Sequence, residues 1–377
     1  MDLTYYRNSD VITGLEDLEN IYTIKNFPVY MGATDQTKEE DQFVDMRFQI
    51  SKSSGMVQIN PLVDLNVVYQ KSHNSGAIGQ VWKDHHKAFS NFILNYDKRK
   101  VLEIGGYSGI LANNCLSNDS SYDWTIIDPH VSPFEENIKT INAFFDETFI
   151  HDSKFDIVVH SHLIEHVINI NSFLQVCFNN LKDDGYMIFS LPNFDLFIKD
   201  RHTNSLNFEH TFYLDQDSLF RLLEINGFEI VNKEFFYKDH HIFYCVQKTK
   251  NHLKIEYQSH YDLNRKIFSD YFKDIDKFIL DANAKFKTEE NVFVFGGHVT
   301  SQFLLCLGLD ENLITCLLDN DPKKQNRRLY GTNLLVQSPE ILANYESPLL
   351  VLKNSLFDEE IREQIYNINK NVRIITF

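Results

Sequence analysis

The chain lacks the features of membrane-spanning and disulfide-bonded proteins. Within its 377 residues, no apolar run reaches the roughly 18 residues that a membrane span needs. The N-terminus has neither the basic nor the apolar segment of a secretion signal, so we expect a cytoplasmic protein without a membrane partner. The five cysteines lie singly in apolar stretches and form no C-x-x-C pair, which favours buried, reduced thiols over disulfides or a zinc cluster.

Positive charge is also scarce. The sequence has 36 Lys and Arg against 53 Asp and Glu, which gives a formal net charge of −17. Because binding to a phosphate backbone requires clustered cationic side chains, this charge argues against a nucleic-acid partner. A hydrophobic content of 43% excludes a disordered chain, and the length suffices for about two or three domains.

A glycine-rich segment follows the apolar run Val101 to Ile104. The run predicts a short buried strand, and Gly105, Gly106 and Gly109 allow a tight turn before a helix that begins near Ile110. Nucleotide-type ligands bind at such a turn, at the carboxyl end of a parallel strand. The spacing of these glycines differs from the G-x-G-x-x-G of dinucleotide-binding proteins.

Two acidic residues narrow the choice of ligand. Glu103 precedes the first glycine by two positions, where its carboxylate would attract the cationic amino and sulfonium groups of S-adenosylmethionine (SAM) and repel a pyrophosphate. Asp128 ends the next apolar run and can accept hydrogen bonds from both ribose hydroxyls of an adenosine. We therefore predict that these two acids and the three glycines bind SAM. A nicotinamide oxidoreductase is disfavoured by the spacing and by Glu103.

The pattern of strands and helices divides the chain into three parts. Residues 1–95 are irregular and predict a small, loop-rich module that ends in a helix near His85 to Tyr96. Residues 96–250 alternate between strand-like and helix-like segments and end in two strand-like runs, which predicts a doubly wound sheet closed by an antiparallel hairpin. Residues 251–377 begin with a long amphipathic helix, Tyr261 to Phe286, and repeat the alternation as a second α/β domain.

Three stretches of the sequence resemble a known family. The first is the glycine segment with Glu103, and the second is Leu206 to Tyr213, which is similar to an H-E-H-x-x-Y segment. The third resembles a D-x-x-P-x-K-Q, P-G-T, P-E series, and it comprises Asp319 to Gln325, Tyr330 to Thr332 and Ser338 to Glu340. Together, over most of the chain, they resemble the SAM-dependent C-methyltransferases of nucleotide-linked deoxysugars.

The resemblance implies a class I, Rossmann-like methyltransferase sheet between a small N-terminal module and a second, C-terminal Rossmann-like domain that helps to hold a nucleotide-activated sugar. The sequence departs from the family in two ways. Residues 1–95 have no cysteine for the family's structural zinc, so packing alone would hold this module. In addition, Phe208 replaces the first histidine of H-E-H, and Asp239, His240 and His241 replace a glycine-rich stretch.

These departures argue against carbon methylation. We therefore expect methyl transfer to a hydroxyl of a nucleotide-activated sugar, in surface polysaccharide biosynthesis. Carbon methylation of a nucleotide-linked keto sugar is the close alternative, and a non-catalytic nucleotide-sugar-binding subunit is another. The sequence leaves the oligomeric state open.

A histidine-rich segment, residues 160–166, predicts a second part of the site. It follows an apolar strand and so lies at the rim where substrate meets SAM, with His160 counted among the cofactor contacts. If a helix begins there, His162, Glu165 and His166 share one face. This spacing is similar to the E-x-x-E-H metal motif of ubiquinone-pathway and small-RNA O-methyltransferases. With His210 as a fourth ligand it would suit Fe, Mn or Zn; in metal-free methyltransferases the acid instead caps the helix and the histidine lines the pocket.

Proton transfer is assigned to His210 and Glu209, with His166 beside them. An imidazole takes up a proton near neutral pH, and a neighbouring carboxylate can orient it. On a keto sugar the same histidine could remove the proton next to the carbonyl. Among the other histidines, we expect His240 and His241 to lie in the closing hairpin, one of them facing the site, and three to be structural or on the surface: His85, His86 and His298.

Overall fold

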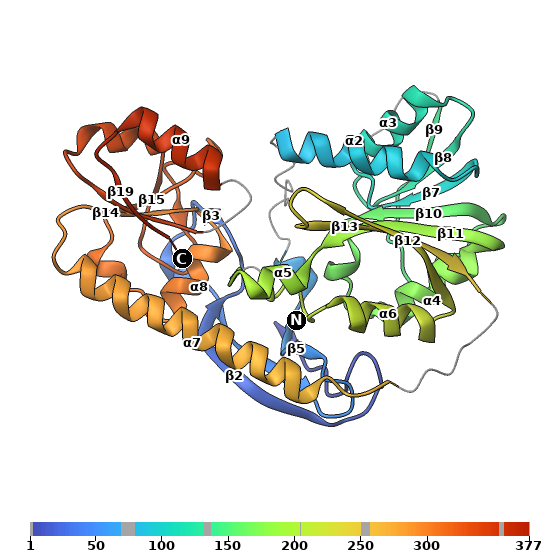
Figure 1. Cartoon of the computed structure of the whole chain (residues 1–377), viewed down its shortest axis with the longest axis horizontal. Coiled ribbons are helices and arrows are strands. Elements are labelled where there is room, and N and C mark those ends of the chain that lie inside the picture. The colour runs from blue at the N-terminus through green and yellow to red at the C-terminus, as the bar shows by residue number, and fades with distance from the viewer. Residues whose placement is uncertain are drawn as a thin grey trace.

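The computed structural model describes residues 3–68, 80–131, 137–203, 205–249, 257–353 and 358–376. Its two α/β sheets lie at opposite ends of the molecule, and the long helix α7 (Tyr261–Phe286) runs along one side of it next to the strands of the N-terminal module (Figure 1). Among the described residues, no helix is long and apolar enough to cross a membrane.

The central sheet has seven strands in the order β12-β13-β11-β10-β7-β8-β9, and only β13 runs antiparallel to its neighbours. In chain order the strands are β7 (Lys100–Ile104), β8 (Asp123–Ile127), β9 (Ile138–Ile141), β10 (Phe155–Ser161), β11 (Leu181–Pro192), β12 (Phe228–Phe236) and β13 (His241–Lys248). This is the strand order of a class I methyltransferase, so the predicted fold class is confirmed.

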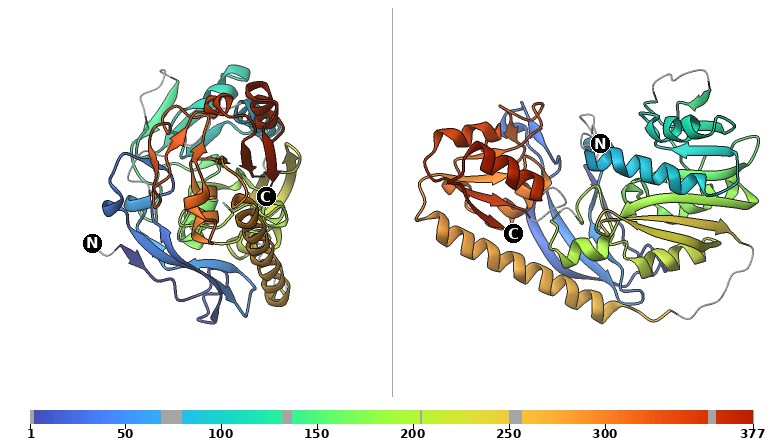
Figure 2. Two further views of the ribbon diagram at one scale, coloured as in Figure 1. Left: turned by 90° about the vertical axis from the view of Figure 1, so that its left-hand side faces the viewer. Right: turned by 45° about the horizontal axis from the view of Figure 1, so that its top comes forward.

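Helices cover both faces of this sheet, which explains why its inner strands read as continuous apolar runs. Helices α2 and α3 lie on one face, and α4 and α6 lie on the other (Figure 1). Their bounds are α2 (Gln80–Leu94), α3 (Ile110–Asn118), α4 (Ile170–Asn180), α5 (Phe194–Lys199) and α6 (Gln216–Ile225). Because α2 packs into the core cluster that contains Trp124, it belongs with the central sheet and not, as the sequence pattern indicated, with the N-terminal module (Figure 2).

The N-terminal module is not the loop-rich segment that we expected. It contains a three-stranded antiparallel sheet, namely β2 (Leu18–Pro28), β4 (Phe43–Ser51) and β5 (Val57–Asn60). The register of β2 against β4 shifts between Asn20 and Tyr22 and again between Ile24 and Phe27. Such bulges break the alternation of apolar and polar residues from which a strand is predicted. The short elements are β1 (Thr4–Tyr5), β3 (Ala33–Thr34), η1 (Lys38–Glu40), β6 (Leu62–Val63) and α1 (Leu65–Val68).

The C-terminal domain is built on a parallel sheet in the order β17-β15-β14-β18-β19. The bounds are β14 (Val292–Phe295), β15 (Cys316–Leu318), β17 (Val336–Gln337), β18 (Leu349–Leu352), β19 (Arg373–Thr376), α8 (Val299–Cys306) and α9 (Asp358–Ile368). Two short helices, η3 (Glu311–Leu313) and η4 (Pro339–Asn344), complete it. The second α/β domain expected from the sequence is thus present; its predicted boundary at residues 250–251 lies outside the described residues.

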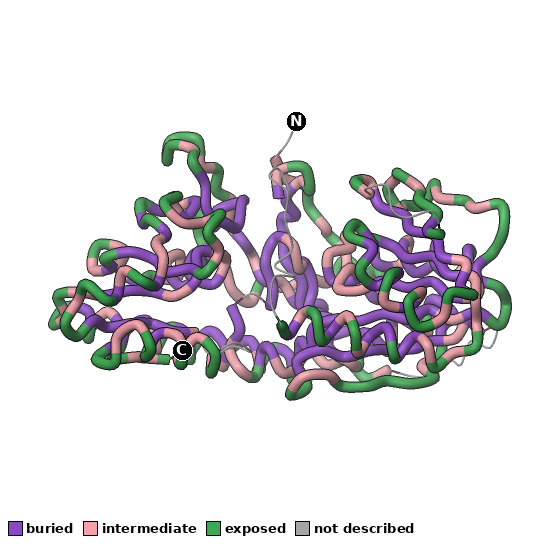
Figure 3. Tube along the Cα trace, turned by 90° about the horizontal axis from the view of Figure 1, so that it is seen from above, coloured by how far each residue is buried: buried purple, intermediate pink, exposed green. Residues whose placement is uncertain are grey.

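The N-terminal module is joined to the C-terminal domain by main-chain and ionic contacts. Its strand β3 pairs with β16 (Arg328–Leu329). The guanidinium of Arg328 lies 2.6 Å from the buried carboxylate of Asp41, and Gln302 donates a hydrogen bond to the Tyr30 carbonyl at 2.9 Å. Buried residues follow the strands of both sheets and continue into the module between them (Figure 3). One core cluster therefore connects the three parts.

Candidate functional site

The turn after β7 has the backbone that the glycines predict. Gly105 and Gly109 have φ values of +75° and +60°, in the left-handed region where a Cβ is unfavourable, and Gly109 is the N-cap of α3. A Cβ at Gly106 would lie 2.6 Å from Cδ of Glu103. The turn therefore depends on glycine at all three positions, and it lies at the carboxyl end of the central strand β7.

The two predicted acids lie beside this turn. Glu103 is 5% exposed, and its Oε2 accepts a hydrogen bond from the Trp124 indole at 2.8 Å. Burial raises the pKa of Glu103 to about 7; the Trp124 hydrogen bond opposes this shift and the negative charge of Asp128 adds to it. Asp128 follows β8, the strand paired with β7, and its Oδ1 accepts the His130 N–H at 2.7 Å. A cationic ligand would relieve the repulsion between these two acids.

His160 lies in the sheet next to the turn. It pairs with Ile104 across β7 and β10, and its ring stacks on Phe189 with centroids 5.0 Å apart. The ring is fully buried, and burial lowers its pKa to about 3, with a smaller effect of His162 in the same direction. The structure thus places His160 among aromatic side chains beneath the rim.

No helix begins at His162, so the condition under which His162, Glu165 and His166 would share one helical face is not met. His162 has a φ of +48°, and only Ile164–His166 forms a short 3₁₀ helix, η2. The His162 N–H donates to the Ser190 carbonyl at 3.0 Å, which continues the pairing of β10 with β11 beyond the end of the strand. His162 therefore precedes the 3₁₀ helix in a left-handed conformation and is not part of it.

The predicted metal ligands are divided between two groups. Glu165, His166 and His210 form one, with ligand atoms within 4.8 Å of one another, and the rings of His166 and His210 are 4.6 Å apart. His162 belongs to the other, with His85 and His241. A 3.1 Å contact from His162 Nδ1 to Glu165 Oε1 links the two groups.

The first group has a buried acid. Glu165 is 1% exposed. Burial raises its pKa to about 7, while the nearby imidazole of His210 acts in the opposite direction. A carboxyl group and two imidazoles at this spacing can bind a divalent cation or pass a proton.

A turn built on Asn207 positions the predicted proton-transfer residues. The Asn207 side-chain oxygen accepts the N–H groups of Glu209 and His210 at 2.7 and 3.1 Å, and its own N–H donates to the His210 carbonyl. We did not predict this role of Asn207 from the sequence, although an Asn two residues before Glu-His is typical of an Asx turn. The next residues pair with the N-terminal module, because Ile59 N–H donates to the Thr211 carbonyl at 2.8 Å.

Known proteins that match this chain are methyltransferases, as the strand order and the glycine turn indicate. A family model described as "Methyltransferase domain" matches residues 78–233. The chain contains a methyltransferase domain. The match begins just before α2 and ends inside β12, so it covers the glycine turn, both predicted acids and both histidine-bearing groups except His241.

Curated relatives match the same region. A probable S-adenosylmethionine-dependent methyltransferase of Mycolicibacterium smegmatis is 38% identical over 139 residues, which is 35% of this chain and 52% of the relative. Another of the same description from Mycobacterium tuberculosis is 29% identical over 154 residues, 39% of this chain and 55% of that protein. The chain spans about half the length of the curated relatives it matches.

Among solved structures, the 1,6-didemethyltoxoflavin-N1-methyltransferase of Burkholderia thailandensis, bound to S-adenosylhomocysteine, aligns with 52% of this chain and 95% of its own. The two sequences are 16% identical, and the TM-score is 0.39.

Proposed function

We propose that the protein transfers the methyl group of SAM to a hydroxyl of a nucleotide-activated sugar, in surface polysaccharide biosynthesis. The observation that carries the first half of this proposal is the turn after β7 with its two acids, Glu103 and Asp128, inside the methyltransferase domain. The SAM-dependent relatives support the same cofactor.

The cofactor would lie across the turn, with its two ends at different acids. The ribose hydroxyls can donate to Asp128, whose Oδ1 also accepts the backbone N–H of His130 in the same loop. The amino and sulfonium charges would lie nearer Glu103, where a cation favours the ionised carboxylate over the neutral acid. A pyrophosphate would meet two like charges there, which disfavours a dinucleotide.

Methyl transfer then requires a nucleophilic oxygen and a proton acceptor. The hydroxyl oxygen bonds to the methyl carbon as the carbon–sulfur bond breaks, and S-adenosylhomocysteine leaves. The hydroxyl proton passes to His210, next to His166 and Glu165, with Glu209 at the other side of the turn. As an alternative to His210 acting as the base, a divalent Fe, Mn or Zn ion, for which Glu165, His166 and His210 are suitable ligands, would lower the pKa of the hydroxyl and make the alkoxide accessible.

The C-terminal domain supports an anionic substrate. The strand β14 is followed by Gly296 and Gly297, and two lysines lie close to that end. Lys324 and Lys353 add to the burial that lowers the pKa of His298 to about 3, while Asp319 opposes this shift. In addition to burial, Lys353 lowers the pKa values of His202 and His240 in the central domain. Lys353 follows β18, so this end of the C-terminal sheet faces that domain. A sugar diphosphate held here could extend toward the methyltransferase site.

Incubating the protein with SAM and a panel of nucleotide sugars, with and without EDTA, tests the proposal. We expect S-adenosylhomocysteine to form with one sugar class and mass spectrometry to find an added methyl ether. Solvent deuterium next to a carbonyl in the product would instead indicate carbon methylation. Binding of SAM and nucleotide sugar without any turnover would make the chain a binding subunit.

A further inference from the structure

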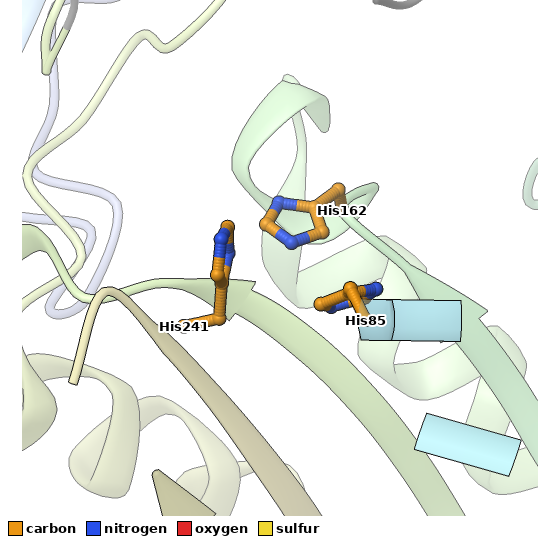
Figure 4. A group of neighbouring side chains, drawn as sticks. All are labelled: His85, His162 and His241. Carbon is orange, nitrogen blue, oxygen red and sulfur yellow. The ribbon is translucent and has the colours of Figure 1, made fainter. Parts of the chain in front are cut away.

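Three histidines from distant parts of the chain meet beside the rim of the central sheet. His85 lies on α2, His162 follows β10, and His241 begins β13. The ring centroids form a nearly equilateral triangle, with separations of 5.1, 5.1 and 5.0 Å. One nitrogen of each lies within 4.8 Å of the others, and the rings surround a common space (Figure 4). We call these residues the His85 triad.

The nitrogens of the triad are buried and mostly lack hydrogen-bond partners. Among the described residues, neither nitrogen of His85 has a partner, nor does Nε2 of His162 or Nδ1 of His241. His85 is completely buried, and His241 is 4% exposed. Leaving a polar group buried and unsatisfied costs about 1–3 kcal/mol, so four such atoms in one place require an explanation.

Aromatic packing alone does not explain the triad. Trp82 lies over all three rings, with centroids at 5.4, 5.0 and 5.6 Å, and Phe236 and Phe243 contact the same space. Phenyl rings at the three positions would fill this apolar surrounding without the desolvation cost of imidazole. A ligand that takes up imidazole lone pairs would offset that cost.

The hydrogen bond of His162 leaves it ready to act as a ligand. Its Nδ1 lies 3.1 Å from the Glu165 carboxyl group, and when that group is ionised the Nδ1–H donates to it and Nε2 keeps its lone pair. Metal-binding histidines usually donate their other N–H to a carboxylate in this way. The backbone of His162 is also in the left-handed region, at φ +48°, a conformation that residues with a side chain adopt at functional sites more often than elsewhere.

We propose that His85, His162 and His241 bind one divalent transition-metal ion, of which Zn²⁺ suits the ligand set best. Three neutral imidazoles around an open fourth position are a common zinc environment. With each nitrogen about 2.1 Å from the ion, the nitrogens would be about 3.4 Å apart, so binding draws the three rings together. Glu165 orients His162 from outside the coordination sphere.

The ion ties α2 to the carboxyl end of the central sheet. Leu163, next to His162, is the side chain that a Cβ at Gly105 would approach, at 3.5 Å. The His85 triad therefore lies one residue from the contact with the glycine turn. This inference is independent of the proposed substrate, and the triad is a different site from the group formed by Glu165, His166 and His210.

Calorimetry with Zn²⁺ on the EDTA-treated chain tests the proposal. We expect one equivalent to bind at the His85 triad, and His85→Ala and His241→Ala each to weaken this binding by about 100-fold or more, because each removes one of three ligands. His86→Ala is the matched control: it is the neighbouring histidine on α2, it also contacts Trp82, and it should bind Zn²⁺ like the wild type. Circular dichroism checks the fold of each variant.

A second measurement leaves the three histidines unchanged. Co²⁺ or Cu²⁺ should quench the fluorescence of Trp82, one of two tryptophans, and this loss should be absent in Trp82→Phe although the ion still binds. The proposal is wrong if the wild type binds no ion. It is also wrong if His85→Ala and His241→Ala bind Zn²⁺ normally while His166→Ala does not, because that result would assign the ion to the other group.

Discussion

The two α/β sheets of this protein share a backbone plan and differ in charge. In each, two glycines follow the first strand, and an aspartate follows the strand paired with it: Asp128 in the central sheet and Asp319 in the C-terminal one. Two residues before the first glycine, however, the central strand has Glu103 and the C-terminal strand has Val294.

The aspartates also differ in their partners. Asp319 Oδ2 accepts the Gly297 N–H at 2.9 Å and the ammonium group of Lys324 at 3.0 Å. Burial alone would raise the pKa of Asp319, but Lys324 lowers it below the ordinary value. Asp128 instead lies near the second acid, Glu103. The side chains around the two turns therefore differ in charge: two acids lie at the central turn, whereas the acid at the C-terminal turn is paired with a lysine.

The largest expected effect separates chemistry from binding. If the central domain carries the reaction, His210→Ala should lower kcat about 10²- to 10⁴-fold, because it removes the proton acceptor, and should leave SAM affinity unchanged. His151→Ala, a loop histidine bonded to the Ser153 carbonyl, is the control. Steady-state kinetics and calorimetry measure both. Full turnover in His210→Ala would remove this residue from the mechanism.

A second effect is the pH dependence of stability that Glu103 causes; the C-terminal sheet has Val294 at the equivalent position. The pKa of Glu103 is about 7 in the folded protein against an ordinary 4.5, so the folded state prefers the neutral acid. Without ligand, the protein should therefore lose stability as the pH rises from about 4.5 to 7 and keep the full penalty, about 3 kcal/mol, above that.

Glu103→Gln has no such titration. The free energy of unfolding of the variant, relative to the wild type, should increase over this pH window and then level off. Denaturant unfolding from pH 5 to 8 measures it. A constant difference across the window would show that Glu103 does not titrate there.

The C-terminal counterpart is Lys324. Lys324→Ala should raise the KM for the nucleotide sugar about 10-fold, the usual cost of a charge-assisted hydrogen bond, without changing the Kd for SAM. Lys139→Ala, which removes a lysine from an exposed pair with Asp123, is the matched control. If Lys324→Ala weakened SAM instead, the assignment of the two ligands to the two sheets would be reversed.

The smallest effect distinguishes the two aspartates. Asp128→Asn keeps one acceptor oxygen for the ribose and should weaken SAM about fivefold, or about 1 kcal/mol. Asp319→Asn should not alter SAM binding. Equal effects of the two substitutions on the SAM affinity measured by calorimetry would argue against a ribose contact at Asp128.

Local patterns could be predicted from the sequence, and long-range ones could not. The bounds of α7 agree with the expected segment, because uninterrupted helical periodicity determines them. The β2–β4 pairing was missed because bulges interrupt its alternation. Whether a helix begins at His162 could not be read from the sequence; in the structure His162 extends the β10–β11 pairing to Ser190, distant in sequence, and has a positive φ.

The site residues also divide into those that form a local sequence motif and those that only the fold brings together. Glu103 and the glycines form one local motif, and the structure places them together at the turn. The His85 triad has no such motif, because its three members come from a helix, a loop and a strand that only the fold brings together. His85 was therefore expected to be structural or on the surface.

Titrating SAM into the wild type and into Glu103→Lys tests the cationic character of the central turn most directly. We predict one SAM per chain for the wild type and no detectable binding to the variant at unchanged circular dichroism, because the lysine would repel the sulfonium and amino groups. Undiminished SAM binding by Glu103→Lys, or binding of a nicotinamide dinucleotide to the wild type in place of SAM, would contradict the account.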